Sequence, residues 1–241
     1  VIKDAALTLL IKDKDGNLVR SISSKKDPNY LRYPGGPSPE PVLSNKVGLN
    51  RFVWDMRHTS IPAMPTAYIE GSFRGHKAMP NTYTGALKQG GKSSEASFNI
   101  VSNPLYTITK EQYKETHDFR TKTETNITDM HMRVNTLKKV QSQIAIILND
   151  LSKEEKYSKV KSEGETIIKK LKSWDEDMVQ RKSKAYDDVE NFPNKFTAEY
   201  IFLISQNDSG LPKVNQASKD RLVELDKQWE VLKTRSNELI N

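Results

Sequence analysis

The spacing of apolar residues changes once along this chain, close to Pro104. Before that proline, apolar residues alternate with polar ones, which is the period of a β-strand that buries one face. After it they recur every three or four residues, which is the period of a helix with one apolar stripe. A segment can satisfy only one of these periods. The sequence therefore predicts two domains, with strands in residues 1–103 and helices in residues 104–241.

Two β-hairpins are predicted in the first domain. Asp15-Gly16 separates the apolar runs 7–11 and 18–22, and Gln89-Gly90-Gly91-Lys92 separates residues 82–87 from 96–101. Glycine adopts the positive φ that such tight turns require, so both segments are typical of hairpins. Between the hairpins, residues 27–45 and 59–80 are rich in proline and glycine, and we expect them to form loops because proline cannot donate to a strand ladder.

Residues 48–57 read Gly-Leu-Asn-Arg-Phe-Val-Trp-Asp-Met-Arg and form the most specific pattern in the chain. On a strand, Phe52, Trp54 and Met56 would share one face, which is suited to filling the core between two sheets. Short strands, tight turns and long loops together predict an antiparallel β-sandwich of immunoglobulin-like size.

The second domain is predicted to be an antiparallel helical bundle of three long helices and one short one. Thr109-Lys110-Glu111-Gln112 has the spacing of a capping box at the start of a helix, and Pro193 precedes the short helical stretch 196–204. Three apolar seams mark the long helices, at Ile127, Met130, Val134, Leu137, Gln141, Ile144, Leu148 and Leu151, at Tyr157, Val160, Gly164, Ile167, Leu171, Trp174 and Met178, and at Leu222, Leu225, Trp229, Leu232, Ser236 and Leu239.

Several of these segments resemble the C-terminal accessory region of bacterial sortilin-like, glycosyl-hydrolase-like β-propeller proteins of the BNR type. The residues that carry the resemblance are the hairpin around Asp15-Gly16, the tryptophan segment 48–57, Pro80-Asn81-Thr82-Tyr83-Thr84, Asn103-Pro104, and the breaks at Asn191-Phe192-Pro193-Asn194 and Ser209-Gly210-Leu211-Pro212. The resemblance implies an immunoglobulin-like accessory domain and a helical domain that follow a propeller. It also implies export to the periplasm, the cell surface or the medium.

These observations favour a non-catalytic accessory role in packing, spacing or protein contact, with the upstream propeller domain as partner. The chain begins with Val1 and enters strand-like sequence almost at once, so we expect it to be a piece of a longer protein. One alternative is a carbohydrate- or peptide-binding module in which Tyr30 and Tyr33 of the proline-rich loop contact the ligand. The favoured interpretation of these two rings is that they pin the loop to the sandwich. Another alternative is an oligomerisation device, in which a second chain completes the helical seams.

No catalytic, cofactor-binding or metal-binding residue is assigned from the sequence. The four histidines, His58, His76, His117 and His131, are far apart, and none has a ligand spacing such as His-Glu-x-x-His. Glycoside hydrolysis needs two carboxylates across a cleft, whereas Asp55 has no evident acidic partner and is expected to pair with Arg51 or Arg57. An enzyme is the weakest hypothesis, and it would require acidic or histidine side chains to converge between the two domains.

The charge distribution does not favour a nucleic-acid partner. The formal net charge is +7, and residues 1–103 hold 14 Lys and Arg against 8 Asp and Glu. These basic residues are scattered, whereas nucleic-acid binding surfaces gather them into a stripe, often with stacking aromatics. No apolar run reaches the roughly 18 residues that span a bilayer, so no membrane span is predicted.

Overall fold

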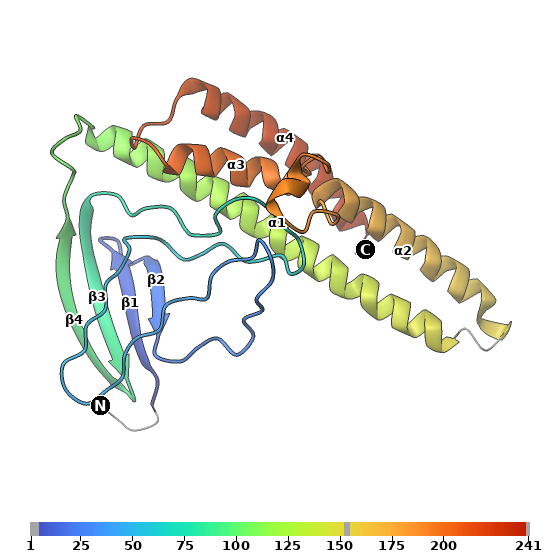
Figure 1. The fold of residues 1–241 in the computed structure, drawn as a ribbon, viewed down its shortest axis with the longest axis horizontal. Coiled ribbons are helices and arrows are strands. Elements are labelled where there is room, and N and C mark those ends of the chain that lie inside the picture. Colours follow the sequence, from blue (N-terminus) through green and yellow to red (C-terminus); the bar gives the residue numbers. More distant parts are fainter. Residues whose placement is uncertain (1–4, 152–154, 240–241) are drawn as a thin grey trace.

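The N-terminal half is a single open antiparallel sheet in this computed structural model, which describes residues 5–151 and 155–239. The strand order is β2-β1-β3-β4 (Figure 1). The strands are β1 (Leu7–Asp13), β2 (Leu18–Ser23), β3 (Asn81–Gln89) and β4 (Lys92–Ile100). The long connection between β2 and β3 places the second hairpin against the first, so that β1 pairs with both β2 and β3.

Both predicted hairpins are confirmed. Gly16 lies at φ +83°, and the carboxylate of Asp13 closes the first turn by accepting bonds from the backbone nitrogens of Asp15 and Asn17 at 2.9 and 2.8 Å. The second turn places Gly90 and Gly91 at positive φ, as the sequence predicts. Turn chemistry of this kind is local, which explains why it could be predicted from a few residues.

The predicted immunoglobulin-like sandwich is corrected by the structure, because the described residues form one sheet and no second sheet packs on it. The second layer is made by the extended connection 24–80, which contributes Leu43, Phe52, Trp54 and Ala78 to the apolar face of the sheet. The prolines and glycines of this connection interrupt backbone pairing, so it covers the sheet without forming a ladder of its own.

The tryptophan segment is likewise not the predicted strand. Phe52 and Trp54 do face the sheet, and the ring of Trp54 meets that of Tyr83 edge to face with centroids 6.0 Å apart. Met56, in contrast, has φ +55° and a side chain that is 50% exposed. A left-handed residue breaks the alternation of a strand, so Met56 turns away from the face it was expected to share.

The helical half agrees with the predicted number and lengths of helices. The long helices are α1 (Lys110–Leu151), α2 (Ser158–Met178) and α4 (Gln216–Glu238), and the short one is α3 (Phe196–Asp208). Two 3-10 turns, η1 (Glu155–Tyr157) and η2 (Tyr186–Val189), lie in the connections. Thr109 and Gln112 form the predicted capping box, with reciprocal bonds of 3.0 and 3.2 Å. None of the helices within residues 5–151 and 155–239 combines the length and the apolar character that crossing a bilayer requires.

One apolar core unites the helices with part of the connection. Trp174, Tyr200, Leu225 and Trp229 are almost fully buried in it, which stabilises the fold by about 1.5–3 kcal/mol for each large side chain. Five residues from before the helical half belong to the same core, namely Ile61, Met64, Ala67, Ile69 and Phe73. The strands end and the helices begin between Ile100 and Lys110, whereas the apolar packing crosses that point.

Two stretches of the connection, residues 56–61 and 73–78, run antiparallel and are called the loop pair below. Three backbone bonds hold them together: Ala78 N to Met56 O at 2.7 Å, His58 N to His76 O at 2.9 Å, and Ile61 N to Phe73 O at 2.7 Å. The two stretches approach closely at Gly75, since a Cβ there would come within 2.5 Å of the carbonyl oxygens of His58 and Thr59. The loop pair lies between the sheet and the helices (Figure 1).

We expect Gly75→Ala to destabilise the protein by about 1–3 kcal/mol, because the added methyl group must push the backbones of the loop pair apart. Urea unfolding followed by circular dichroism measures the change. Gly210→Ala is the matched control, since a Cβ at that position meets nothing within 4 Å. Equal unfolding free energies for the two variants would contradict the close approach at Gly75.

Candidate functional site

Three of the four histidines meet where the loop pair crosses α1. His58 and His76 come from the two stretches of the loop pair, and His117 comes from the first turns of α1; these three residues are called the histidine cluster. One ring nitrogen from each lies within 4.8 Å of one from each of the others. The rings of His58 and His76 stack with centroids 4.0 Å apart and planes 16° apart. His76 is 2% exposed, and the other two are half-buried.

Glu124, two turns further along α1, fixes the orientation of His76. One carboxylate oxygen accepts the backbone N–H of His76 at 2.6 Å, and the other lies 2.7 Å from its Nδ1. On the opposite side of the ring, His76 Nε2 lies 3.0 Å from Nδ1 of His117. Both nitrogens of the buried ring are therefore bonded to residues of α1.

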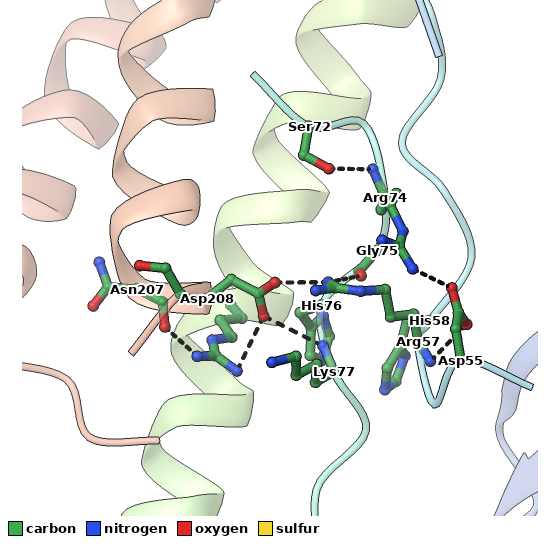
Figure 2. A network of polar contacts seen from close by, with 12 residues as sticks. Asp55, Arg57, His58, Ser72, Arg74, Gly75, His76, Lys77, Asn207 and Asp208 are labelled. Atoms are coloured by element: carbon green, nitrogen blue, oxygen red, sulfur yellow. Dashed lines mark hydrogen bonds and ion pairs between the residues drawn. The ribbon is translucent and has the colours of Figure 1, made fainter. Parts of the chain in front are cut away.

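An ion network lies beside the cluster and links the loop pair to both α1 and α3. Asp208, the last residue of α3, bonds Arg57 Nη1 at 2.6 Å and lies 3.4 Å from Nη1 of Arg120 (Figure 2). Arg57 also donates to the carbonyl oxygen of Gly75 at 2.8 Å, and Arg120 donates to the carbonyl oxygen of Asn207. Arg120 is only 5% exposed. Glu124, Arg57, Arg120 and Asp208, together with the histidine cluster, are called the joint below.

Burial governs the protonation of these groups. It lowers the pKa of His58 to about 3, with the neighbouring imidazoles acting in the same direction, and it lowers the pKa of His76 to about 4, where the charge of Arg120 adds to the effect. The pKa of His117 is also lowered, chiefly by burial. For Glu124 burial raises the pKa to about 8, although the bond from the His76 backbone favours the ionised form. The three imidazoles are uncharged at neutral pH.

The arrangement offers two kinds of chemistry. Uncharged imidazoles carry a free lone pair and are common ligands of transition metals. A chain of hydrogen bonds from Glu124 through His76 to His117 can also pass a proton. His58 and His117 line a hollow of about 810 Å³, shared with Asp13 and Asp118, through which a small molecule can approach.

Tyr30 and Tyr33 do not take part in this site. The hydroxyl of Tyr30 donates to the carbonyl oxygen of Pro37 at 3.0 Å, and the Tyr33 ring lies against Gly36, where a Cβ would come within 2.7 Å of it. Both rings thus contact their own loop, and with Arg32 they line an open hollow elsewhere on the surface.

Asp55 and His131 also lie outside the histidine cluster. Asp55 pairs with Arg74 at 2.7 Å and lies 3.8 Å from Arg20, and of the two expected arginines only Arg57 bonds it, through its backbone nitrogen. His131, the fourth histidine, lies outside the cluster and is fully buried, with its Nδ1 2.7 Å from the carbonyl oxygen of Pro62.

The convergence of the histidines was missed by reasoning from the sequence. One signal was present, because His117, Arg120 and Glu124 follow each other at intervals of three and four residues. Such spacing places them on one face of a helix, where a polar stripe beside an apolar seam indicates a buried polar contact. The loop residues that meet this stripe carry no comparable signal.

Comparisons with known proteins add no assignment: no protein-family model matches the chain, and searches of curated proteins and of solved structures gave no match.

The joint predicts a specific dependence of stability on pH. The buried histidines bind protons more weakly in the folded than in the unfolded state, so the free energy of unfolding falls as the pH drops from 6.5 towards 4. Glu124 acts in the opposite sense, because its folded pKa is raised from 4.5 to about 8, and its contribution to stability is lost as the pH rises through that interval.

Glu124→Gln should remove the second effect. We expect the variant to lose stability more steeply than the wild type below pH 6.5, by about 1.4 kcal/mol per pH unit, and to show no fall between pH 6.5 and 8. Urea unfolding between pH 4.5 and 8 in a buffer with a chelator measures both. Glu163→Gln changes an exposed carboxylate and should follow the wild-type profile. Parallel profiles for all three proteins would show that Glu124 does not titrate as described.

Proposed function

We propose that this chain is a non-catalytic accessory region of a larger exported β-propeller protein, in which it holds a sheet and a helical arm at a fixed orientation. The joint is the observation that supports this role most directly. Buried ion pairs need good geometry to offset the cost of removing charges from water, so they hold the groups that form them in one arrangement. A spacer or packing element needs such a fixed arrangement between its parts.

The fixed orientation depends on a continuous series of polar contacts. Arg20 of β2, which is 4% exposed, donates to the carbonyl oxygen of His58 at 2.9 Å and also pairs with Glu40. This contact ties the sheet to the loop pair. Arg57 and His76 of the loop pair then bond Asp208 of α3 and Glu124 of α1. Each step uses a largely buried group, so neither half can turn without leaving one of them unpaired.

The helical half includes an extended arm formed by α1 and α2. Leu148 of α1 packs against Gly164 of α2, where a Cβ would come within 2.7 Å of the leucine, so the two helices lie close together far from the joint. The far part of this helix pair extends beyond α3 and α4 (Figure 1). An arm of this kind suits a spacer or a contact surface for another protein.

The family and the location are supported by the sequence resemblance alone, chiefly by the tryptophan segment 48–57.

The carbohydrate- or peptide-binding alternative would use Tyr30 and Tyr33, whose hollow is open to solvent. The enzyme hypothesis has one observation in its favour. It required acidic or histidine side chains to converge between the two halves, and three histidines do so. Against it, both nitrogens of His76 bond residues of α1 and the ring of His58 stacks on it, so two of the three imidazoles have a structural role.

Asp208→Asn should loosen the joint, because it removes the anion that lies between Arg57 and Arg120. We expect the free energy of unfolding to fall by about 2–3 kcal/mol. We also expect the distribution of distances between the halves to broaden. The chain contains no cysteine, so spin labels at Ser94→Cys and Gln143→Cys, both exposed, report this distance by pulsed electron spin resonance.

Glu163→Gln again provides the control, since its ion pair with Lys159 is exposed and 4.0 Å long and should contribute under about 0.5 kcal/mol. The wild type and this control should both give one narrow distance distribution. A broad distribution in the wild type would rule out the fixed orientation on which the proposed role depends.

The oligomerisation alternative has one observation in its favour. Ile146 and Ile147 of α1 and Val160 and Ile167 of α2 are between 40% and 63% exposed in the far part of the arm. If a second chain covers them, the wild type will sediment as a dimer at micromolar concentration and Ile146→Ser/Ile147→Ser will sediment as a monomer. Under the accessory role we expect a monomer in both cases.

A further inference from the structure

We propose that His58, His76 and His117 form a binding site for one divalent transition-metal ion such as Zn²⁺. The inference goes beyond the accessory role, since the ion can bind whether or not the orientation of the two halves is fixed. It rests on the positions of the three rings, on the residue that orients the central one, and on the hollow beside them.

The spacing of the ligand atoms is close to that of a metal centre. Two imidazole nitrogens bound to one tetrahedral Zn²⁺ at about 2.05 Å lie about 3.3 Å apart. His76 Nε2 and His117 Nδ1 are 3.0 Å apart, so a small separation of the two rings admits an ion between them. His58 completes the set within 4.8 Å. Its ring must tilt out of the stack on His76, and its position at the wall of the hollow gives it room to do so.

The central ligand is already oriented for binding. Metal-bound histidines commonly donate their second N–H to a carboxylate, which fixes the tautomer and the plane of the ring. One oxygen of the Glu124 carboxyl group accepts the backbone N–H of His76 at 2.6 Å, and the other lies 2.7 Å from Nδ1. When an ion binds at Nε2, the imidazole proton must lie on Nδ1, and Glu124 must release its own proton in order to accept it. The lone pair on Nε2 then points towards His117.

The ligand types select the metal. Three imidazoles suit zinc, copper, nickel and iron, whereas Mg²⁺ and Ca²⁺ require oxygen ligands that this set does not offer. The positive charges of Arg57 and Arg120 are balanced in part by Asp208. On the other side, three aspartates and three lysines line the hollow, and Asp118 pairs with Lys114, so the hollow carries no net formal charge that would repel a cation. Solvent or a small anion in the hollow supplies the fourth ligand.

Titration of the chelator-treated chain with Zn²⁺ by isothermal calorimetry tests the site, and Co²⁺ gives an independent readout through the visible absorption of a four-coordinate ion. We expect one ion per chain. His117→Gln and His58→Gln should each weaken binding at least 100-fold and abolish the Co²⁺ spectrum, since glutamine is a poor ligand that preserves side-chain volume and hydrogen bonding.

His131→Gln is the matched control, because His131 lies outside the cluster and its Nδ1 contacts Pro62. This variant should bind as tightly as the wild type. Circular dichroism verifies that each variant is folded. The absence of a stoichiometric site in the wild type, or binding that survives His117→Gln, would overturn the proposal.

Glu124→Gln tests the orienting role separately. The amide has one acceptor, which the backbone N–H of His76 requires, so its NH₂ group must face Nδ1. The amide cannot lose a proton at neutral pH, so the imidazole proton stays on Nε2 and blocks the ligand position. We expect Zn²⁺ binding to weaken about 10–100-fold. In the presence of Zn²⁺, the ¹⁵N chemical shifts of His76 should report the Nδ1–H tautomer in the wild type and the Nε2–H tautomer in the variant, a difference that loss of packing alone would not produce. Unchanged affinity together with an unchanged tautomer would remove Glu124 from the proposal.

Discussion

Two guanidinium groups that are largely removed from solvent, those of Arg57 and Arg120, share the single carboxylate of Asp208. A buried cation without a partner is costly, so the end of α3, the loop pair and the start of α1 must meet at this point. Arg57 also holds Gly75, and Gly75 admits the close approach that places His58 beside His76. The relative position of sheet and helices, and hence the histidine cluster, follows from this one arrangement of charges.

Features that depend on nearby residues could be predicted from the sequence. Asp15-Gly16 and Gly90-Gly91 specify their turns through φ alone, and Thr109 caps α1 through a residue three positions away. The helical seams were predicted because a period of three to four residues over several turns has one structural meaning. The tryptophan segment shows the limit of such reasoning. Its alternation did identify Phe52 and Trp54 as core residues, but a single left-handed residue, Met56, was enough to end the pattern.

The histidine cluster depends on distant residues, and this is why its convergence was missed and only the part on α1 has a signal in the sequence. The spacing of His117, Arg120 and Glu124 on α1 is visible in the sequence and indicates a polar contact. The other half is set by three backbone bonds between the stretches of the loop pair, which have no periodic pattern and lie within proline- and glycine-rich sequence. The conformation of such loop residues is set by the helices against which they pack, so their contacts are visible only in the tertiary structure.

The length of α1 has a mechanical consequence. Its 42 residues extend for about 63 Å, and the stretch from Glu124 to its last residue accounts for about 40 Å of that. A helix of this length acts as a lever whose fulcrum lies at the joint. A tilt of about 5° there would displace the far tip by about 3.5 Å, which is comparable to the rise of two helical residues. A small change in the packing of the side chains around His76 would therefore cause a larger displacement at the far end of α1.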